Sequence, residues 1–204
     1  MDLDIFAGDP SNGNGEPSSS FGGSALNPGY WNRILAGGHG PDALLDLGAQ
    51  PTSVVMTVPV GSGSGGGSNY PINTGDYALL LNDYAVIPDL MVFRFTGMRP
   101  GAYRVYTYAV SAIGDTWPVD VTVDGAVVNP FRVTGPMPGN ALILGITHAE
   151  HYVPDLTGDL FIRLASPWPR GNVNGFQIVA VPEPASFAVL SFSLLIAARR
   201  RCRV

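Results

Sequence analysis

Two tryptophans in this sequence stand close to charged residues, a combination that sugar-binding sites use. Asp115 comes just before Trp117, and Arg170 comes just after Trp168. The face of an aromatic ring can stack on the apolar face of a sugar, while carboxylate and guanidinium groups hydrogen-bond to its hydroxyls. Prolines flank both tryptophans, which favours exposed loops. We therefore predict a glycan-binding site formed by Trp117, Trp168, Asp115 and Arg170.

The alternative for every tryptophan is a structural role. Tryptophan side chains are on average highly buried, so each could close an end of a hydrophobic core instead of facing a ligand. For Trp31, which precedes Asn32, we favour this structural role. For Trp117 and Trp168 both roles stay open.

No arrangement typical of an enzyme is evident in the sequence. Lysine is absent, because all 11 basic residues are arginine, and this excludes Schiff-base and Ser-x-x-Lys chemistry. The Gly-x-Ser-x-Gly turn of many serine hydrolases is also missing. A pair of catalytic carboxylates stays open, since the 16 acidic residues include aspartates that could meet in the folded chain. We predict a protein that is not an enzyme, with an extracellular carbohydrate-active hydrolase as the alternative.

The residues that could bind a metal ion are poorly arranged for that purpose. His148 and His151 would face opposite sides of an extended segment, so their imidazoles would not converge on one ion. Residues 9–16 carry oxygen-bearing side chains, but the stretch lacks the acidic residue that ends an EF-hand loop. Calcium there is an alternative to a simple polar loop. We predict no metal site and no other cofactor.

The charge of the chain argues against nucleic acid as a partner. The formal net charge is −5, and four of the arginines lie at the very end of the chain: Arg199, Arg200, Arg201 and Arg203. The remainder of the chain is therefore more acidic than the total suggests, and it would repel phosphate groups. The single cysteine, Cys202, excludes an internal disulfide.

Alternating apolar and polar residues predict an all-β domain, an antiparallel sandwich of the jelly-roll type. Strands are predicted at residues 3–6, 54–60, 77–81, 90–95, 103–110, 119–123, 126–128, 141–147, 160–164 and 176–181. Only residues 41–47 favour a helix. The spacing of these segments, with Gly, Pro, Asn and Asp between them, is typical of two packed antiparallel sheets.

Two turns can be predicted in more detail. Asp124-Gly125 is a typical hairpin turn, which would lead directly into a return strand at residues 126–128. Pro100-Gly101 suits a type II turn, and Tyr103 follows it. This spacing resembles the tyrosine corner of Greek-key sandwiches, in which the phenol bonds to backbone upstream. We expect Tyr103 to be structural.

The last residues of the chain carry the most specific pattern. Two prolines surround one glutamate in Val181, Pro182, Glu183 and Pro184, which prevents a helix from continuing across them. Residues 185–198 are uncharged and would form a helix of about 21 Å, short of a membrane core of about 30 Å. The arginine cluster follows at once and would stay in the cytoplasm.

This order of segments resembles the PEP-CTERM sorting tail. The resemblance covers residues 181–204 and implies recognition by an exosortase in the inner membrane of a Gram-negative bacterium. It further implies cleavage near the Pro-Glu-Pro motif and delivery to the cell surface or extracellular matrix. Such export needs a signal peptide, yet Met1 is followed by an acidic stretch without an apolar segment. We therefore expect that the true start lies upstream, with a chain that is a fragment of a longer protein as the alternative.

The rest of the chain resembles a galactose-binding-like jelly roll of the kind found before such tails. The resemblance rests on the opening strand, Trp31-Asn32, the Pro-Gly-x-Tyr corner and the closing segment at 173–178. It implies glycan binding through loops at one end, sometimes with a structural calcium ion. We therefore divide the chain into a domain at 1–181 and a sorting signal at 182–204. The predicted function is that of an exported surface or matrix protein, either a scaffold or a glycan-binding module for extracellular polysaccharide.

Overall fold

The computed structural model describes residues 1–6, 15–35, 41–57, 65–67, 71–111, 115–168 and 170–182. In this part of the chain strands predominate and one short helix is present, which confirms the prediction of an all-β domain. Glu183, Pro184, the predicted hydrophobic helix and the arginine cluster lie outside the described residues, as do residues 9–14 of the calcium candidate. Within the described residues, no helix is long and apolar enough to cross a membrane.

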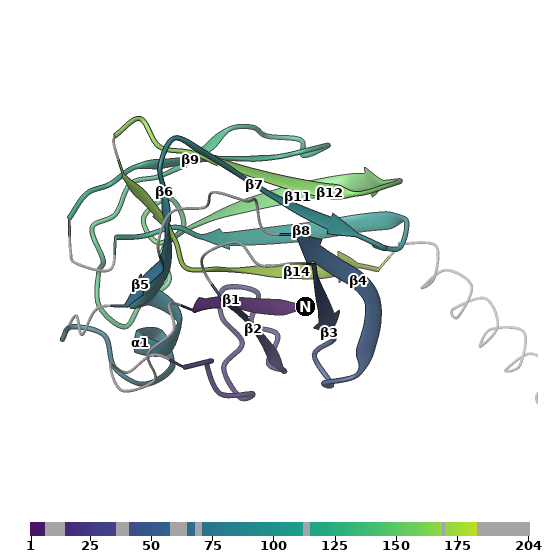
Figure 1. The fold of residues 1–204 in the computed structure, drawn as a ribbon, viewed down its shortest axis with the longest axis horizontal. Helices are drawn as coiled ribbons and strands as arrows, with labels where there is room; N and C mark the ends of the chain where they lie inside the picture. The colour runs from purple at the N-terminus through teal and green to yellow at the C-terminus, as the bar shows by residue number, and fades with distance from the viewer. Residues whose placement is uncertain are drawn as a thin grey trace, which may run out of the picture.

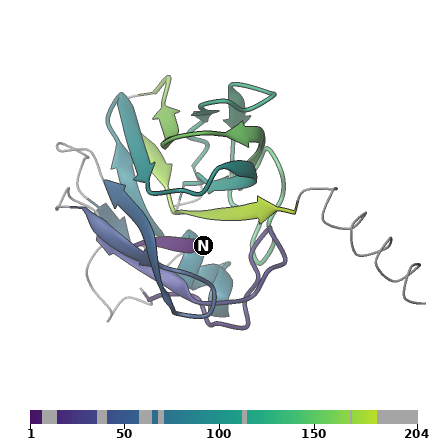
Figure 2. The same ribbon diagram turned by 90° about the vertical axis from the view of Figure 1, so that its right-hand side faces the viewer.

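Two large sheets form the body of the molecule (Figures 1 and 2). The five-stranded sheet contains, in order, β11 (His148–Leu156), β8 (Gly101–Tyr108), β14 (Gly175–Val181), β1 (Asp2–Phe6) and β2 (Trp31–Leu35). The six-stranded sheet contains β10 (Phe131–Val133), β9 (Val119–Val123), β12 (Leu160–Ala165), β7 (Leu90–Thr96), β4 (Pro51–Thr57) and β3 (Asp42–Leu45). A small third sheet contains β13 (Gly171–Val173), β6 (Asp83–Ile87) and β5 (Gly65–Gly67).

The main core lies between the two large sheets, where their apolar faces meet. Strand β9 shows the cause most simply, because every second residue is a valine and all three valines are buried. Phe93 of β7 packs on Phe176 of β14 with ring centroids 4.8 Å apart, and Phe95 packs on the same ring at 6.0 Å. These contacts join one sheet to the other.

A second apolar cluster lies on the opposite face of the five-stranded sheet. It combines Trp31 of β2 and Tyr108 of β8 with Leu80 and Leu81 of the helix α1 (Gly75–Leu81). Trp31 is only 1% exposed, and its Nε1 donates a hydrogen bond to the Phe21 carbonyl oxygen at 3.1 Å. The structural role expected for Trp31 is therefore correct, although the residue belongs to this second cluster and not to the main core.

Two segments have the opposite secondary structure to the one predicted. Residues 77–81, predicted as a strand, belong to helix α1, and residues 41–47, predicted as a helix, contain the edge strand β3. Periodicity cannot separate the two structures in apolar runs this short. Burial of Leu80 and Leu81 in the second cluster stabilises α1, while pairing with β4 fixes β3.

The predicted return strand at 126–128 is also wrong. The turn itself is present, since Gly125 has φ of +75° and the Ala126 amide donates to the Val123 carbonyl at 3.1 Å. The backbone of Val123 is then bonded by a side chain instead of by the predicted return strand. The Asn129 Oδ1 accepts a hydrogen bond from the Val123 amide, and its Nδ2 donates one to the Val123 carbonyl oxygen. The returning strand, β10, begins only at Phe131.

Two further predictions about strands are corrected. Residues 141–147 do not form a strand, since 145–147 are a turn and Leu144 makes only an isolated bridge with His148, where β11 begins. Strand β1 pairs with β14 antiparallel, but it pairs with β2 in parallel, with Asp2 opposite Trp31. A parallel pair requires a long connection, and the whole segment from residue 7 to residue 30 separates these two strands. The sandwich is therefore not purely antiparallel.

The tyrosine corner is confirmed. The Tyr103 hydroxyl donates a hydrogen bond to the Arg99 carbonyl oxygen at 2.7 Å, and the side chain is 8% exposed. Gly101 has φ of +144°, a conformation that side chains rarely adopt. The Tyr103 hydroxyl thus helps to fix the turn between β7 and β8.

Candidate functional site

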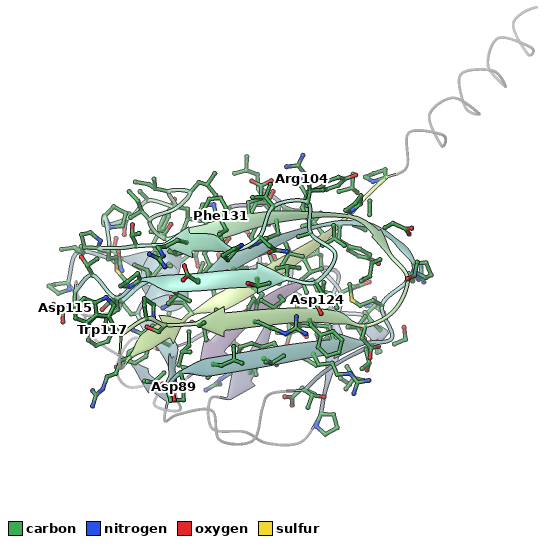
Figure 3. All side chains as sticks on the ribbon, turned by 90° about the horizontal axis from the view of Figure 1, so that it is seen from above. Asp89, Arg104, Asp115, Trp117, Asp124 and Phe131 are labelled. Carbon is green, nitrogen blue, oxygen red and sulfur yellow. The ribbon has the colours of Figure 1, made fainter. Side chains whose placement is uncertain are left out.

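Three loops meet at one end of the sandwich, which we call the loop end. It comprises residues 88–89 before β7 with Leu90, the first residue of that strand, residues 115–118 before β9, and residues 166–168 and 170 after β12. Antiparallel pairing of β9 with β12 brings the second and third loops together, since Ala165 lies opposite Asp120. Figure 3 shows Asp89, Asp115 and Trp117 at this end of the molecule.

One serine holds the three loops to each other. The Ser166 amide donates to the Asp89 carbonyl at 3.2 Å. Its hydroxyl lies 3.2 Å from the carbonyl oxygens of both Pro118 and Arg170, and it accepts a hydrogen bond from the Trp168 amide at 3.3 Å. Because these bonds reach every loop, the backbone on which the predicted sugar-binding side chains stand is fixed.

The structure brings all four predicted site residues to the loop end. Trp168 is 59% exposed, so it does not fill the core. Trp117 is half-buried, whereas Asp115 and Arg170 are exposed. An indole and a guanidinium therefore face solvent on one loop, with a carboxylate and a second indole on the neighbouring loop. This set can stack on a sugar ring and exchange hydrogen bonds with its hydroxyls.

Arg170 differs from most arginines of the domain in its charge environment. Four arginines form ion pairs on the strands: Arg94 with Asp159, Arg104 with Glu150, Arg132 with Asp120 and Arg163 with Asp124. Arg170 makes no ion pair with any residue that the structure describes, so its guanidinium donors are available to a ligand.

Analysis of the sequence missed Ser166, Asp89 and Leu90. Leu90 is 58% exposed and adds apolar surface to the loop end. No local pattern marks these residues, because a serine that follows a strand is common in loops. Only the pairing of β9 with β12 and of β12 with β7 shows that they border the tryptophans.

The two histidines of β11 lie apart, as the sequence predicted. His148 packs against the rings of Tyr106 and Tyr108, while His151 points to the opposite face and packs against Phe131. Burial lowers the pKa of His148 to about 4 and also lowers the pKa of His151. Burial thus favours the neutral form of both side chains, which belong to the packed interior.

Among the described residues, the two carboxylates with raised pKa values border neither of the two cavities described below. Asp2 and Asp83 are fully buried, and burial raises the pKa of Asp2 to about 6 and that of Asp83 to about 7. A cavity of about 540 Å³ is bordered by one carboxylate, that of Asp46. Among the described residues that border a second cavity of about 400 Å³, none is acidic. Glycoside hydrolysis needs two carboxyl groups facing one bond, and neither cavity provides them.

Comparison with known proteins gives distant structural likenesses. No family model matches the sequence, and no curated protein matches it. A β-glucuronidase of Bacteroides uniformis is 13% identical over 74% of this chain with a TM-score of 0.47, and the chain spans 15% of that enzyme. The carbohydrate-binding module TmCBM61, solved with β-1,4-galactotriose, is 13% identical over 63% of this chain and 88% of its own, with a TM-score of 0.35.

A third similar structure is CBM35 from Cellvibrio japonicus Abf62, 14% identical over 72% of this chain and 90% of its own, with a TM-score of 0.34. Carbohydrate-binding modules and a glycoside hydrolase are thus among the solved structures to which this chain is similar. With TM-scores below 0.5 for all three, these likenesses carry no argument about activity or ligand. The function has to be argued from the loop end itself.

Proposed function

We propose that this domain is a non-enzymatic module that binds polysaccharide at the loop end. The observation that carries the proposal is the 59% exposure of Trp168, a large aromatic side chain held outside the core on a loop fixed by Ser166. Exposed aromatic rings supported by a rigid backbone lose little conformational freedom on binding. A sugar ring stacked on this indole would remove its apolar surface from water.

The polar neighbours of Trp168 support the same ligand class. Arg170 and Asp115 offer donors and acceptors without an ion pair between described residues to satisfy them beforehand, and Trp117 offers a second ring. Sugars present both apolar faces and hydroxyls, so they suit a mixed site of this kind.

The absence of a carboxylate pair from the two cavities argues against the hydrolase alternative. Asp46 is the one acidic residue among the described residues that border the larger cavity. Glycoside hydrolysis requires a second carboxyl group on the other side of the scissile bond. We therefore infer that the domain binds its ligand without cleaving it.

For the end of the chain we propose a PEP-CTERM sorting function, with an exosortase as the processing partner. The support is the sequence pattern of residues 181–204 together with the position of Val181, which is the last residue of β14. The motif thus begins where the sheet ends, and Pro182 is exposed. On this proposal the inner membrane is a transient location, and the cell surface or extracellular matrix is the destination.

Substitution of Trp168 tests the binding proposal. A panel of plant and bacterial polysaccharides first identifies a ligand by affinity electrophoresis with the full chain. Trp168→Ala should then weaken binding by about 1–3 kcal/mol, the loss typical of one important aromatic contact, and leave the melting temperature unchanged. Trp117→Ala should weaken binding in the same direction.

Tyr152 provides the matched control. It is an exposed aromatic residue on β11, 41% accessible, and lies away from the loop end. Tyr152→Ala should bind as the wild type does. Undiminished binding by Trp168→Ala, or loss of binding by Tyr152→Ala alone, would contradict the proposed site, and a chain that binds no polysaccharide of the panel would point to a scaffold.

A further inference from the structure

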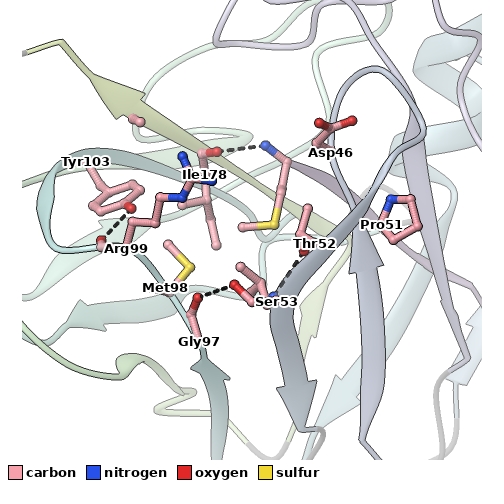
Figure 4. Close-up of a pocket in the computed structure, with 12 residues that line it drawn as sticks. Asp46, Pro51, Thr52, Ser53, Gly97, Met98, Arg99, Tyr103 and Ile178 are labelled. Atoms are coloured by element: carbon pink, nitrogen blue, oxygen red, sulfur yellow. Dashed lines mark hydrogen bonds between the residues drawn. The ribbon is translucent and has the colours of Figure 1, made fainter.

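The cavity of about 540 Å³ lies at the end of the sandwich opposite the loop end (Figure 4). Strand β7 begins beside the loop end at Leu90, runs the length of the sheet to Thr96, and is followed by Gly97–Arg99, which border the cavity. Residues of both large sheets line it, among them Val54 of β4 and Ile178 of β14. Its volume falls within the range of about 300–1,000 Å³ typical of small-ligand sites. We call it the Arg99 pocket.

The loop that carries Arg99 is held from two sides. The Tyr103 hydroxyl donates to the Arg99 carbonyl at 2.7 Å, and the Ser53 hydroxyl donates to the Gly97 carbonyl at 2.9 Å. Gly97 has φ of +72°, and a Cβ atom there would lie 2.1 Å from the Ser53 carbonyl oxygen. The backbone of Arg99 is therefore fixed beside the pocket before any ligand arrives.

The walls of the Arg99 pocket combine apolar and charged groups. Val54, Met98, Ile178 and the Tyr103 ring provide apolar surface. Asp46 stands on the opposite side of the pocket from Arg99 (Figure 4). Its Oδ1 accepts hydrogen bonds from the amides of Gly48 and Gln50 at 2.8 and 2.9 Å, which fix the carboxylate. The N-terminal ammonium of Met1, which also borders the pocket, interacts electrostatically with the same carboxylate.

Arg99 makes no ion pair and no side-chain hydrogen bond with any residue that the structure describes. It shares this condition with Arg170 at the loop end, whereas Arg94, on the strand that leads to Arg99, is paired with Asp159. In a domain with an excess of carboxylates, a guanidinium that faces a pocket without an acidic partner keeps its planar set of donors for a carboxylate ligand.

We propose that the Arg99 pocket binds a uronate residue of an acidic polysaccharide. Arg99 would hold the sugar carboxylate, Asp46 would accept a hydrogen bond from a ring hydroxyl, and Met98 and Ile178 would contact the apolar face of the ring. The proposal rests on the proposed function of the domain as a polysaccharide-binding module and adds a second site, selective for charge, at the other end. A neutral sugar would leave the guanidinium without a partner.

Titration of the isotope-labelled full chain with free sugars tests this pocket directly by NMR. D-glucuronate should shift the amide signals of residues 52–54 and 97–103 with saturation, whereas D-glucose should leave them unchanged. Arg99→Gln should weaken the glucuronate affinity at least tenfold. Arg94→Gln, which changes an exposed arginine of the same segment that does not border the pocket, should bind glucuronate as the wild type does.

N-acetylglycine, a carboxylate of peptide type, completes the test. Equal shifts with N-acetylglycine would assign the pocket to peptide carboxylates, and equal shifts with glucose would show that charge is not recognised; either result overturns the proposal. Absence of shifts, or shifts confined to residues 115–118 and 166–170, also overturns it. Trp168→Ala separates the two proposals: glucuronate binding at the Arg99 pocket should persist in that variant even though polysaccharide binding at the loop end is weakened.

Discussion

Some ionisable side chains of this domain are buried away from water. Asp83 is the strongest case, since its carboxyl group is fully buried and neither oxygen has a hydrogen-bond partner among the described residues. Burial raises its pKa to about 7, and the charge of Arg33 offsets part of this effect. The protonated form is thus the one that the fold accommodates best.

The stability of the domain should therefore depend on pH through Asp83. In the unfolded chain the carboxyl titrates near its ordinary pKa of 3.8. Between that value and about 7 the folded state holds the extra proton, so the stabilisation is complete at low pH and is lost as the pH rises towards 7. Asp83→Asn should remove this loss, so that its stability relative to the wild type rises by on the order of 3–4 kcal/mol between pH 4 and pH 8.

Thermal unfolding of both proteins between pH 4 and pH 8 measures this difference. The buried histidines act in the other direction, because their lowered pKa values destabilise the fold as the pH falls, but they are common to both proteins. Asp155→Asn, at an exposed position, is the control and should leave the profile unchanged. If the stabilities of Asp83→Asn and of the wild type change with pH in the same way, the raised pKa of Asp83 is contradicted.

At the scale of elements, the domain uses short side-chain bonds to fix the loops between strands. Ser166 connects the three loops of the loop end, and Tyr103 with Ser53 fixes the turn beside the Arg99 pocket. The loops at each end of the sandwich are therefore fixed by their own set of hydrogen bonds. A loop that is fixed in this way presents its side chains to a ligand with little loss of entropy.

Ser166→Ala leaves Trp117 and Trp168 unchanged but removes the side-chain hydrogen bonds that connect the loops. It should therefore weaken polysaccharide binding several-fold. Its cost in stability should be about 1 kcal/mol, the net value of an ordinary hydrogen bond. Asn129→Ala removes the side-chain bonds of Asn129 to the Val123 amide and carbonyl, at 2.9 and 2.6 Å, at the other end of β9 from the loop end. It should lower stability to a similar extent with full binding. Equal binding losses in both variants would assign the effect to stability alone.

At the scale of the whole molecule, the proposed sorting function assigns separate roles to the sandwich and to the last residues. The described chain leaves the five-stranded sheet after Val181, at the start of the Pro-Glu-Pro motif. If the motif is a sorting signal, the mature protein should end near Pro182–Pro184. Mass spectrometry of the extracellular fraction should then find no peptide from residues 199–204, and a strain without its exosortase should retain the full chain. Intact terminal peptides outside the cell, or unchanged release in that strain, would refute this function.

Much of the fold could be predicted because it depends on neighbours in the sequence. The alternation at residues 119–123 specifies β9, and the Pro-Gly-x-Tyr spacing specifies the corner at Tyr103. The predictions failed where a short segment suited two structures. Residues 77–81 are helical because the second cluster buries Leu80 and Leu81, and Asn129 replaces a strand residue by bonding to Val123.

The sequence by itself determined the types of residue that could bind a sugar, the class of the fold and the pattern of the C-terminal tail. Only the tertiary structure decided that Trp31 is buried while Trp168 is exposed, and that the loops of Trp117 and Trp168 are neighbours. It also decided the parallel pairing of β1 with β2 and the position of Arg99 beside a pocket. The physical reason is one of range: alternation and turn chemistry act over a few residues, whereas burial and charge pairing depend on contacts between segments far apart in the chain.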